Sequence, residues 1–373
     1  MGCAVSRPVL RLIADDLTGA LDTAAELAGL CGPVPVAWDG AGGGPGSLAL
    51  DSGTREADRA AALHRLRPLL PMLEGAAIAY KKIDSLLRGQ VAAELAACLA
   101  AGRWAHCILA PAFPAQGRIL RGGRMLARQP DGAWAALDRD LLAALRAEGL
   151  RPAAGAPDAP LPPGLAVFDA ESEADLARIA ALGRAAAGPV LWCGSGGLAR
   201  ALAGDAAAPA STRLRGPVLG LFGSDQAVTA RQLAACAGCW IRLADGGEAG
   251  AARVGRALAA GTALVSLDLP AGIDRAAAAG CIDEAMAALL PRLPRPGTLA
   301  VAGGETLRAV CRRLGARSLE AVGIVAPGVP RSVLRGGAWD GVEVVSKSGA
   351  FGGDTLWRDL LAGNGLITRS IEA

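Results

Sequence analysis

Two adjacent carboxylates, Asp15 and Asp16, stand between a strand-like apolar run and a helix-like segment in LIADDLTGALDTA, residues 12–24. Carboxylates at such a turn can accept the proton of a substrate hydroxyl or bind Mg²⁺ through water. One of them would suffice to cap the helix, and side chains on adjacent extended residues point in opposite directions. We therefore expect different roles. One of the two accepts the proton of the substrate hydroxyl, with Asp16 as the first candidate and Asp15 as the second, and the other braces the turn or caps the helix at Thr18.

A second polar cluster, KKIDSLLRG at residues 81–89, follows the apolar run AAIAY. Its Lys82, Asp84 and Arg88 supply a compact cation, an acid and a guanidinium that can hold a carboxylate through two hydrogen bonds. Of the 38 basic residues in the chain only three are lysines, two of them in this cluster, which favours a specific need for an ammonium group. An ordinary surface turn that caps the next helix remains the alternative.

Two glycine-rich segments in the C-terminal half each follow a strand-like run: AGGETLRAVCRRLG at residues 302–315 and SKSGAFGG at residues 346–353. Glycines let the backbone approach a phosphate closely, and the start of a helix attracts an anion. Neither segment matches the Walker A or the G-x-G-x-x-G pattern, so a nucleotide site here would be unconventional. The residues suited to phosphate binding are Gly303, Gly304, Glu305, Thr306, Lys347 and Gly349.

The elements that must position these groups alternate along the chain between short apolar strands and Ala/Leu-rich helices. This alternation predicts an α/β fold with mostly parallel sheets, in which ligands bind at the carboxyl ends of strands. The small, polar segment 205–216 is the expected linker. We therefore expect two Rossmann-like α/β domains, at residues 1–208 and 209–373, with the active site in a cleft between them.

Composition excludes several classes of function. The net charge of +3 is small, the arginines are scattered and aromatic residues make up 3 %, which together argue against nucleic-acid binding. No apolar run is long enough to span a bilayer, so no membrane partner is expected. The irregularly spaced cysteines, Cys236 and Cys239 included, are expected to be ordinary thiols in a reducing cytoplasm rather than a zinc or redox site.

Eight motifs, in order, resemble those of the four-carbon acid sugar kinases, a family that includes 3-oxo-tetronate, D-threonate and D-erythronate 4-kinases. They are IADDLTGALDTA, KKIDSLLRGQ, APAFPAQGR, GSGGLA, GSDQAVTARQ, GGETLRAVCRRLG, APGVPRSVL and KSGAFG. The resemblance implies that the first domain binds a sugar acid and that the second binds ATP with Mg²⁺. It implies transfer of a phosphoryl group to the terminal C4 hydroxyl. The residues that it marks as sugar-acid ligands are Asp15, Asp16, Lys82, Asp84 and Arg88. Those that it marks as ATP contacts are Ser224, Gly303, Gly304, Glu305, Thr306 and Gly349, with Lys347 nearby. Lys347 and Mg²⁺ would offset the charge of the phosphates during transfer, so Lys347 is expected to be catalytic together with Asp16 and Asp15.

The chain departs from the family pattern at a few positions. Leu86 replaces a threonine, Gln90 replaces an asparagine, and Asp225 and Gln226 replace a Cys-Ser pair. Leu86 removes a hydroxyl near the expected substrate, and Asp225 adds negative charge near the expected nucleotide. These departures leave open the identity of the four-carbon acid and the alternative of a non-catalytic sensor on the same fold. Separately from these departures, a homodimer is possible, and the sequence assigns no metal ligand.

Overall fold

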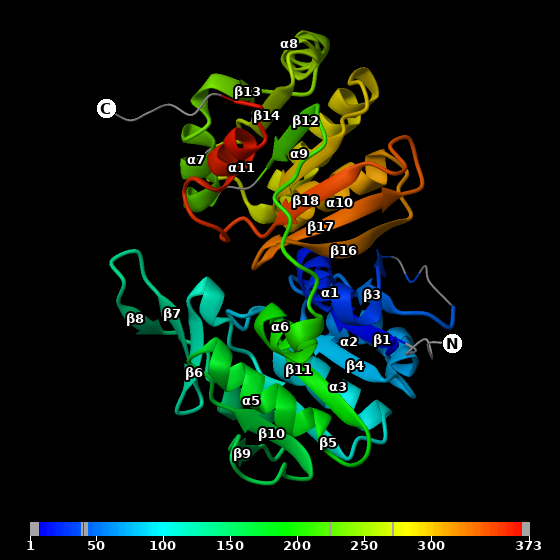
Figure 1. Ribbon diagram of the computed structural model, residues 1–373, viewed down its shortest axis with the longest axis vertical. Coiled ribbons are helices and arrows are strands. Elements are labelled where there is room, and N and C mark those ends of the chain that lie inside the picture. The colour runs from blue at the N-terminus through cyan, green and yellow to red at the C-terminus, as the bar shows by residue number, and fades with distance from the viewer. Residues whose placement is uncertain (1–6, 39, 41–43, 224–225, 271, 368–373) are drawn as a thin grey trace. The chain divides into compact units, whose positions relative to one another are not determined.

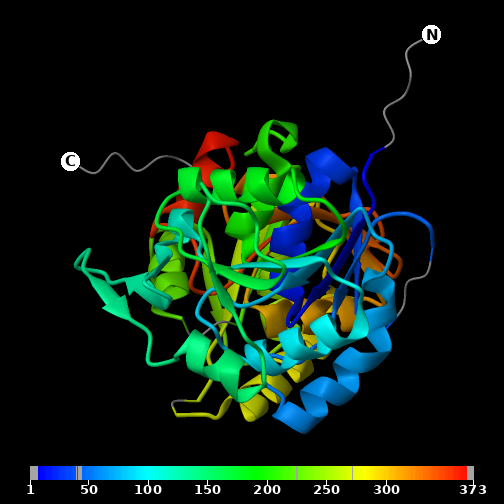
Figure 2. The same cartoon turned by 90° about the horizontal axis from the view of Figure 1, so that it is seen from below.

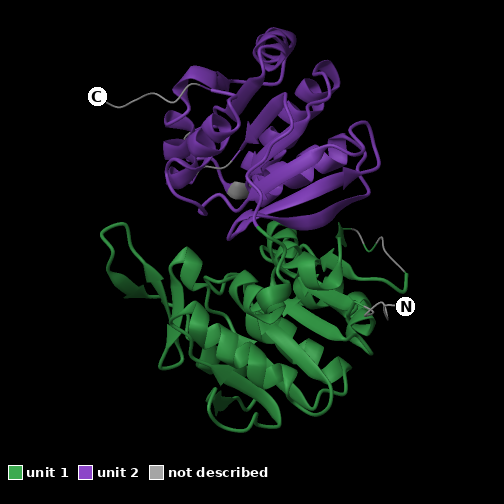
Figure 3. Ribbon diagram, in the orientation of Figure 1, with its two compact units in different colours: residues 1–209 green, residues 210–373 purple. Residues whose placement is uncertain are grey.

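The computed structural model describes residues 7–38, 40, 44–223, 226–270 and 272–367 (Figure 1). The chain forms two compact units, residues 1–209 and residues 210–373 (Figure 3). The predicted α/β class with mostly parallel sheets is confirmed.

The first unit is built on a parallel sheet with the strand order β2-β3-β1-β4-β11-β5-β10-β9. Its strands are β1 Leu10–Ala14, β2 Val34–Ala37, β3 Leu48–Asp51, β4 Ile78–Lys82, β5 His106–Ala110, β9 Ala153–Gly155, β10 Gly164–Phe168 and β11 Val190–Gly194. Its α-helices are α1 Leu17–Cys31, α2 Arg59–Leu66, α3 Val91–Ala101, α4 Leu141–Ala147, α5 Glu173–Arg184 and α6 Gly196–Ala203.

Helices cover both faces of this sheet. On one face α1 packs against α6 and α6 against α5, and on the other α3 packs against α2 and α4. Figure 2 shows the strands between these two helix layers. The central strands are mostly apolar because both of their faces are buried, as is typical of parallel sheets. Their charged residues are Arg11 in β1 and Lys81 and Lys82 in β4.

Residues 117–138 interrupt the alternation of strands and helices with an antiparallel three-stranded ribbon. Its strands are β6 Arg118–Arg121, β7 Arg124–Arg128 and β8 Trp134–Ala136. The ribbon follows the short 3₁₀ helix η2 at Pro114–Gln116, and the turn between β6 and β7 uses Gly122 and Gly123 at positive φ, as tight hairpins require.

The second unit has a mixed sheet with the order β13-β14-β12-β15-β18-β17-β16, antiparallel only at β18-β17-β16. Its strands are β12 Val218–Phe222, β13 Trp240–Leu243, β14 Thr262–Leu267, β15 Thr298–Ala302, β16 Ser318–Ala326, β17 Val329–Arg335 and β18 Glu343–Lys347. Its α-helices are α7 Ala227–Ala234, α8 Glu248–Ala259, α9 Arg275–Leu289, α10 Gly304–Arg313 and α11 Leu356–Gly363. Further 3₁₀ helices are η1 Arg67–Leu73 and η3 Gly204–Ala206 in the first unit, and η4 Ala237–Cys239 and η5 Leu290–Arg292 in the second.

Sequence reasoning missed the antiparallel pair β16 and β17. Pro330 lies inside β17, where a proline argues against a strand, and Gly323 adjoins an irregular register in β16. Their pairing is decided by contacts between strands, which no local pattern displays. Among the described residues, no helix has both the length and the apolar character needed to cross a membrane.

Candidate active site

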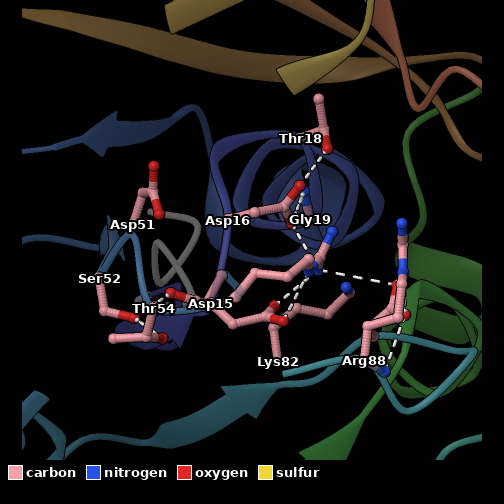
Figure 4. Close-up of polar contacts among 12 residues, drawn as sticks. Asp15, Asp16, Thr18, Gly19, Asp51, Ser52, Thr54, Lys82 and Arg88 are labelled. Carbon is pink, nitrogen blue, oxygen red and sulfur yellow. Dashed lines mark hydrogen bonds and ion pairs between the residues drawn. The ribbon is translucent and has the colours of Figure 1, made fainter. Parts of the chain in front are cut away.

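Asp16 caps α1. Its backbone is extended, with φ −148°, and its carboxylate accepts hydrogen bonds from the Gly19 N–H at 2.9 Å and the Thr18 hydroxyl at 2.5 Å (Figure 4). The cap is therefore Asp16, the residue expected to be the base, and not Asp15. Asp16 lies one residue after Asp15 and so reaches the free N–H groups of the first turn. It keeps 19 % of its side chain exposed, so capping leaves part of the carboxylate accessible.

Arg55, which sequence reasoning missed, links the two acids. Its Nε and Nη2 bond the two oxygens of Asp15 at 2.8 and 2.7 Å, and Nη2 also lies 2.7 Å from Asp16 Oδ1. Its backbone is held too, because the N–H groups of Thr54 and Arg55 both bond the Asp15 carbonyl. Arg55 follows β3, so the rule that ligands gather after parallel strands would have found it.

This pairing decides the charge of both groups. Burial alone would raise the pKa of Asp15, but the adjacent Arg55 guanidinium outweighs it and leaves that pKa below its ordinary value. Burial would likewise lower the pKa of Arg55, and Asp15, Asp16 and Asp84 together raise it well above normal. The pair therefore stays ionised although Arg55 is only 11 % exposed.

Asp84 and Arg88 form a bidentate pair in the turn after β4. Arg88 Nε and Nη2 bond the two Asp84 oxygens at 2.7 and 2.9 Å, and the Arg88 N–H bonds Asp84 as well. Burial raises the pKa of Asp84, but Arg88 and Arg55 lower it well below its ordinary range. Asp84 thus occupies one edge of the Arg88 guanidinium, formed by Nε and Nη2. The other edge, formed by Nη1 and Nη2, is the one on which Arg88 would bind a substrate carboxylate as predicted.

The same turn carries an unusual backbone. Leu87 has φ 56°, in the left-handed region that residues other than glycine avoid, and its N–H bonds the Asp84 carbonyl. Such conformations cost about 1–3 kcal/mol and cluster at functional sites. The Leu87 carbonyl is held by Arg139 Nη1 at 2.6 Å, which stabilises the turn that presents Arg88.

The adjacent lysines of β4 point to opposite faces of the sheet, as alternate strand residues must. Lys81 is fully buried and pairs with Glu94 of α3 at 2.8 Å. Lys82 lies toward α1, where a Cβ on Gly19 would stand 2.7 Å from its Nζ. Glycine at position 19 thus leaves room for this ammonium where it lies; Lys82 is 5 % exposed (Figure 4).

Two further acids of α1 lie one and two turns after Thr18. Asp22 is buried beside Gly196 of α6, whose Cβ would stand 2.4 Å from the Asp22 carboxylate. Burial raises its pKa to about 6, with Lys82 opposing and Asp16 adding to the rise. Burial and Asp22 raise the pKa of Glu26 to about 8, and neither of its carboxylate oxygens bonds a described residue. The spacing 18, 22, 26 was a visible signal of one polar stripe on an otherwise apolar helix.

In the second unit the predicted phosphate-binding residues fall at two strand ends. Gly303 has φ 101° and precedes α10, so Gly304, Glu305 and Thr306 form its first turn, where backbone N–H groups have no partner inside the helix. The Thr306 hydroxyl accepts the Gly223 N–H at 3.2 Å, which leaves its own O–H able to donate to a ligand. Ser224 and Asp225 lie outside the described residues.

Lys347 ends β18 beside this helix start. The Gly303 N–H bonds the Lys347 carbonyl at 3.0 Å, which joins the two glycine-rich segments. The Lys347 amine is 1 % exposed and donates to the carbonyls of Ser348 and Gly349 at 3.0 and 2.9 Å. Burial lowers its pKa to about 7. The structure thus brings Gly303 and Lys347 together, with the amine turned toward its own loop.

Comparisons with known proteins bear on both units. Residues 10–144 match a family model described as a sugar-binding N-terminal domain, and residues 219–356 match a nucleotide-binding C-terminal domain. A D-threonate kinase of Cupriavidus necator is 36 % identical, with 93 % of this chain and 96 % of that protein covered. A D-threonate kinase of Bordetella bronchiseptica is 32 % identical, with 92 % and 95 % covered.

The chain belongs to the four-carbon acid sugar kinase family. It is therefore a sugar-acid kinase, a phosphotransferase whose chemistry implies ATP as the co-substrate, rather than a non-catalytic sensor.

Solved structures share the fold of this kinase. One from Salmonella typhimurium LT2 gives a TM-score of 0.67 at 22 % identity, covering 93 % of this chain and 97 % of the other. The Haemophilus influenzae protein HI1011 gives 0.64 at 19 % identity, covering 95 % and 99 %. At these identities the likeness concerns the fold alone.

Proposed function

We propose that this kinase transfers the γ-phosphoryl group of ATP to the C4 hydroxyl of a four-carbon sugar acid, with D-threonate as the first candidate. The observation that carries the proposal is the paired cluster Asp15, Arg55, Asp16, Asp84 and Arg88 after three neighbouring parallel strands. Two D-threonate kinases at 36 % and 32 % identity support the choice of substrate. Erythronate and 3-oxo-tetronate are the other candidates.

In this proposal the first unit binds the sugar acid. Arg88, oriented by Asp84, receives the substrate carboxylate on its unoccupied guanidinium edge, and the Lys82 ammonium donates to a substrate oxygen. Asp16, the more exposed of the adjacent acids, orients the C4 hydroxyl and accepts its proton. Asp15 holds Arg55, which keeps the Asp16 carboxylate in place.

The second unit binds ATP in the same proposal. The N-terminus of α10, at Gly303 to Thr306, and the loop after β18, with Gly349, offer backbone N–H groups to phosphates. Ser224 is assigned to this site from the family pattern. Mg²⁺ would enter with the nucleotide, because this ion is held largely by phosphates and water. Among the described residues no three acids, histidines or cysteines are grouped to hold a metal.

Release of ADP from ATP and Mg²⁺ in the presence of D-threonate, L-threonate, D-erythronate, L-erythronate and 3-oxo-tetronates tests the activity. We expect D-threonate to give the highest kcat/KM, and ³¹P–¹³C coupling in the product places the phosphate on C4. No ADP release with any of these acids would defeat the proposal, and coupling to another carbon would defeat the C4 assignment.

Arg88→Lys tests the carboxylate contact. A point charge cannot reproduce the bidentate fork, so KM for the sugar acid should rise about tenfold or more, and KM for ATP should change little. Arg59→Lys is the matched control, because Arg59 makes the same bidentate contact with Glu148 on the surface of the unit. Equal effects of Arg88→Lys on both substrates would argue against a carboxylate role.

A further inference from the structure

Three buried side chains of the second unit donate hydrogen bonds to carbonyl groups of the loop after β18. Lys347 Nζ donates to Ser348 O and Gly349 O, at 3.0 and 2.9 Å. Thr229 Oγ1, from α7, donates to Gly349 O at 2.9 Å. Gln232 Nε2, one turn along, donates to Phe351 O and Gly353 O at 3.2 and 2.9 Å. Thr229, Gln232 and Lys347, which we call the carbonyl clamp, are each at most 1 % exposed.

The clamp decides where the N–H groups of this loop point. In a planar trans peptide the carbonyl of one residue and the N–H of the next point in opposite directions. Because the carbonyls of Ser348 and Gly349 are pinned to the clamp, the N–H groups of Gly349 and Ala350 face away from it. Neither N–H donates to any residue that the structure describes, although Gly349 is buried. Buried backbone donors normally have a partner, so a ligand is the natural acceptor.

An anion fits these two donors better than a neutral group. Successive N–H groups that point the same way form an anion-binding concavity. The bond from Gly303 N–H to the Lys347 carbonyl fastens the loop to the start of α10, whose first-turn N–H groups also favour negative charge. Both sets of donors therefore belong to one rigid arrangement within the second unit.

The buried Lys347 amine has hydrogen-bond acceptors within the protein and does not need a phosphate as its acceptor. With its pKa lowered to about 7 by burial, about half of Lys347 is uncharged at neutral pH, and the uncharged form predominates above it. A neutral amine has two N–H donors, and Ser348 and Gly349 supply two carbonyl acceptors. The contacts of Lys347 are therefore those of a residue that fixes the backbone conformation of the loop after β18.

We propose that the carbonyl clamp is a set of positioning residues that turns the Gly349 and Ala350 N–H groups toward a phosphate of ATP. The clamp acts through the backbone and does not itself touch the nucleotide. This inference rests on the proposed ATP site in the second unit, and deepens it by naming the residues that build it.

The test uses the full-length kinase with Thr229→Val and Gln232→Met, which keep side-chain volume but remove the donors. We expect each to raise KM for ATP and Kd for ADP about tenfold, the order expected for one or two lost buried hydrogen bonds. KM for the sugar acid and the affinity for adenosine, which has no phosphate, should stay within about twofold. Thr229→Ser keeps the hydroxyl and should restore ADP binding.

Arg231→Met is the matched control. Arg231 lies between the two clamp residues of α7 but makes an exposed ion pair with Asp354 at 2.9 Å, so ADP binding should be unchanged.

If both clamp variants bind ADP like the wild type while the wild type phosphorylates a sugar acid, the clamp is refuted and the proposed function stands. Equal losses for ADP and adenosine would also refute it, because they indicate general disruption. A wild type that binds neither ATP nor ADP would overturn the proposed nucleotide site and the clamp together. If Thr229→Val does not fold, Gln232→Met alone tests the clamp. A lower affinity for ADP with an unchanged affinity for adenosine then supports it, and any other result refutes it.

Discussion

The two units use the carboxyl ends of parallel strands in chemically different ways. The first unit gathers ionised side chains there and pairs them with one another, so that one guanidinium, that of Arg55, contacts both Asp15 and Asp16. The second unit gathers glycines and backbone N–H groups, and its buried Lys347 contacts carbonyls rather than carboxylates. The comparison teaches that a site made of charges must carry its own counter-charges when it is buried, whereas a site made of backbone donors needs only correct orientation.

This difference predicts unequal costs of mutation. Removing one member of a buried ion pair leaves an uncompensated charge, which costs about 3–5 kcal/mol. Removing one neutral donor from a buried hydrogen bond costs about 1–3 kcal/mol. The first site should therefore be the more fragile in folding, and the second should fail mainly in ligand binding.

The largest effect is expected for Arg55→Met, which leaves Asp15, Asp16 and Asp84 without their shared cation. We expect the free energy of unfolding of the first unit to fall by about 3–5 kcal/mol, measured by urea denaturation, and kcat to be lost. Arg59→Met, which removes a surface pair with Glu148, should cost within about 1 kcal/mol. Similar costs for the two variants would break the comparison between the units.

Asp15→Asn and Asp16→Asn, measured side by side, sharpen the roles within the first site. Asparagine caps helices about as well as aspartate, so Asp16→Asn should keep its melting temperature and lower kcat by roughly 10²–10⁴. Asp15→Asn removes a charge-assisted pair with Arg55 and should cost about 1.5–3 kcal/mol of stability. If neither variant lowers kcat by about tenfold, the proposed base is wrong, and Asp84 becomes the next candidate.

Glu26, like Asp22, departs from the charge pairing of the first unit, and the effect of replacing it depends on pH. Burial raises its pKa to about 8 from an ordinary 4.5, so the folded protein binds the proton more tightly than the unfolded chain does. The stabilisation from this proton is complete below the unfolded pKa and is lost as pH rises through the folded one. The melting temperature of Glu26→Gln should thus exceed that of the wild type by about 10 °C at pH 8 and above, and the two should converge toward pH 4.5.

Glu74→Gln is the control for this titration, because Glu74 is an exposed carboxylate of the same unit. Its melting temperature should follow the wild type at every pH. A Glu26→Gln curve that runs parallel to the wild type across this range would show that Glu26 is not held in the uncharged form.

The sequence by itself determined the α/β class, because buried parallel strands are short apolar runs and helices follow them in alternation. It also determined where chemistry lies: Asp15, Asp16, Asp84 and Arg88 follow such strands in the first unit, and Lys82 ends one. Their order and spacing carried the resemblance to the sugar-acid kinases, which family matching then established. These features are local, so neighbouring residues suffice to display them.

Tertiary structure alone decided which groups meet. Arg55 joins Asp15 across 40 residues, and Thr229 reaches the Gly349 carbonyl across 120. The choice of Asp16 as the cap depended on where α1 begins, and the β16–β17 pair depended on contacts between strands. Long-range pairings are set by packing and by the need to compensate buried charge and satisfy buried donors, and these conditions exist only once the chain has folded.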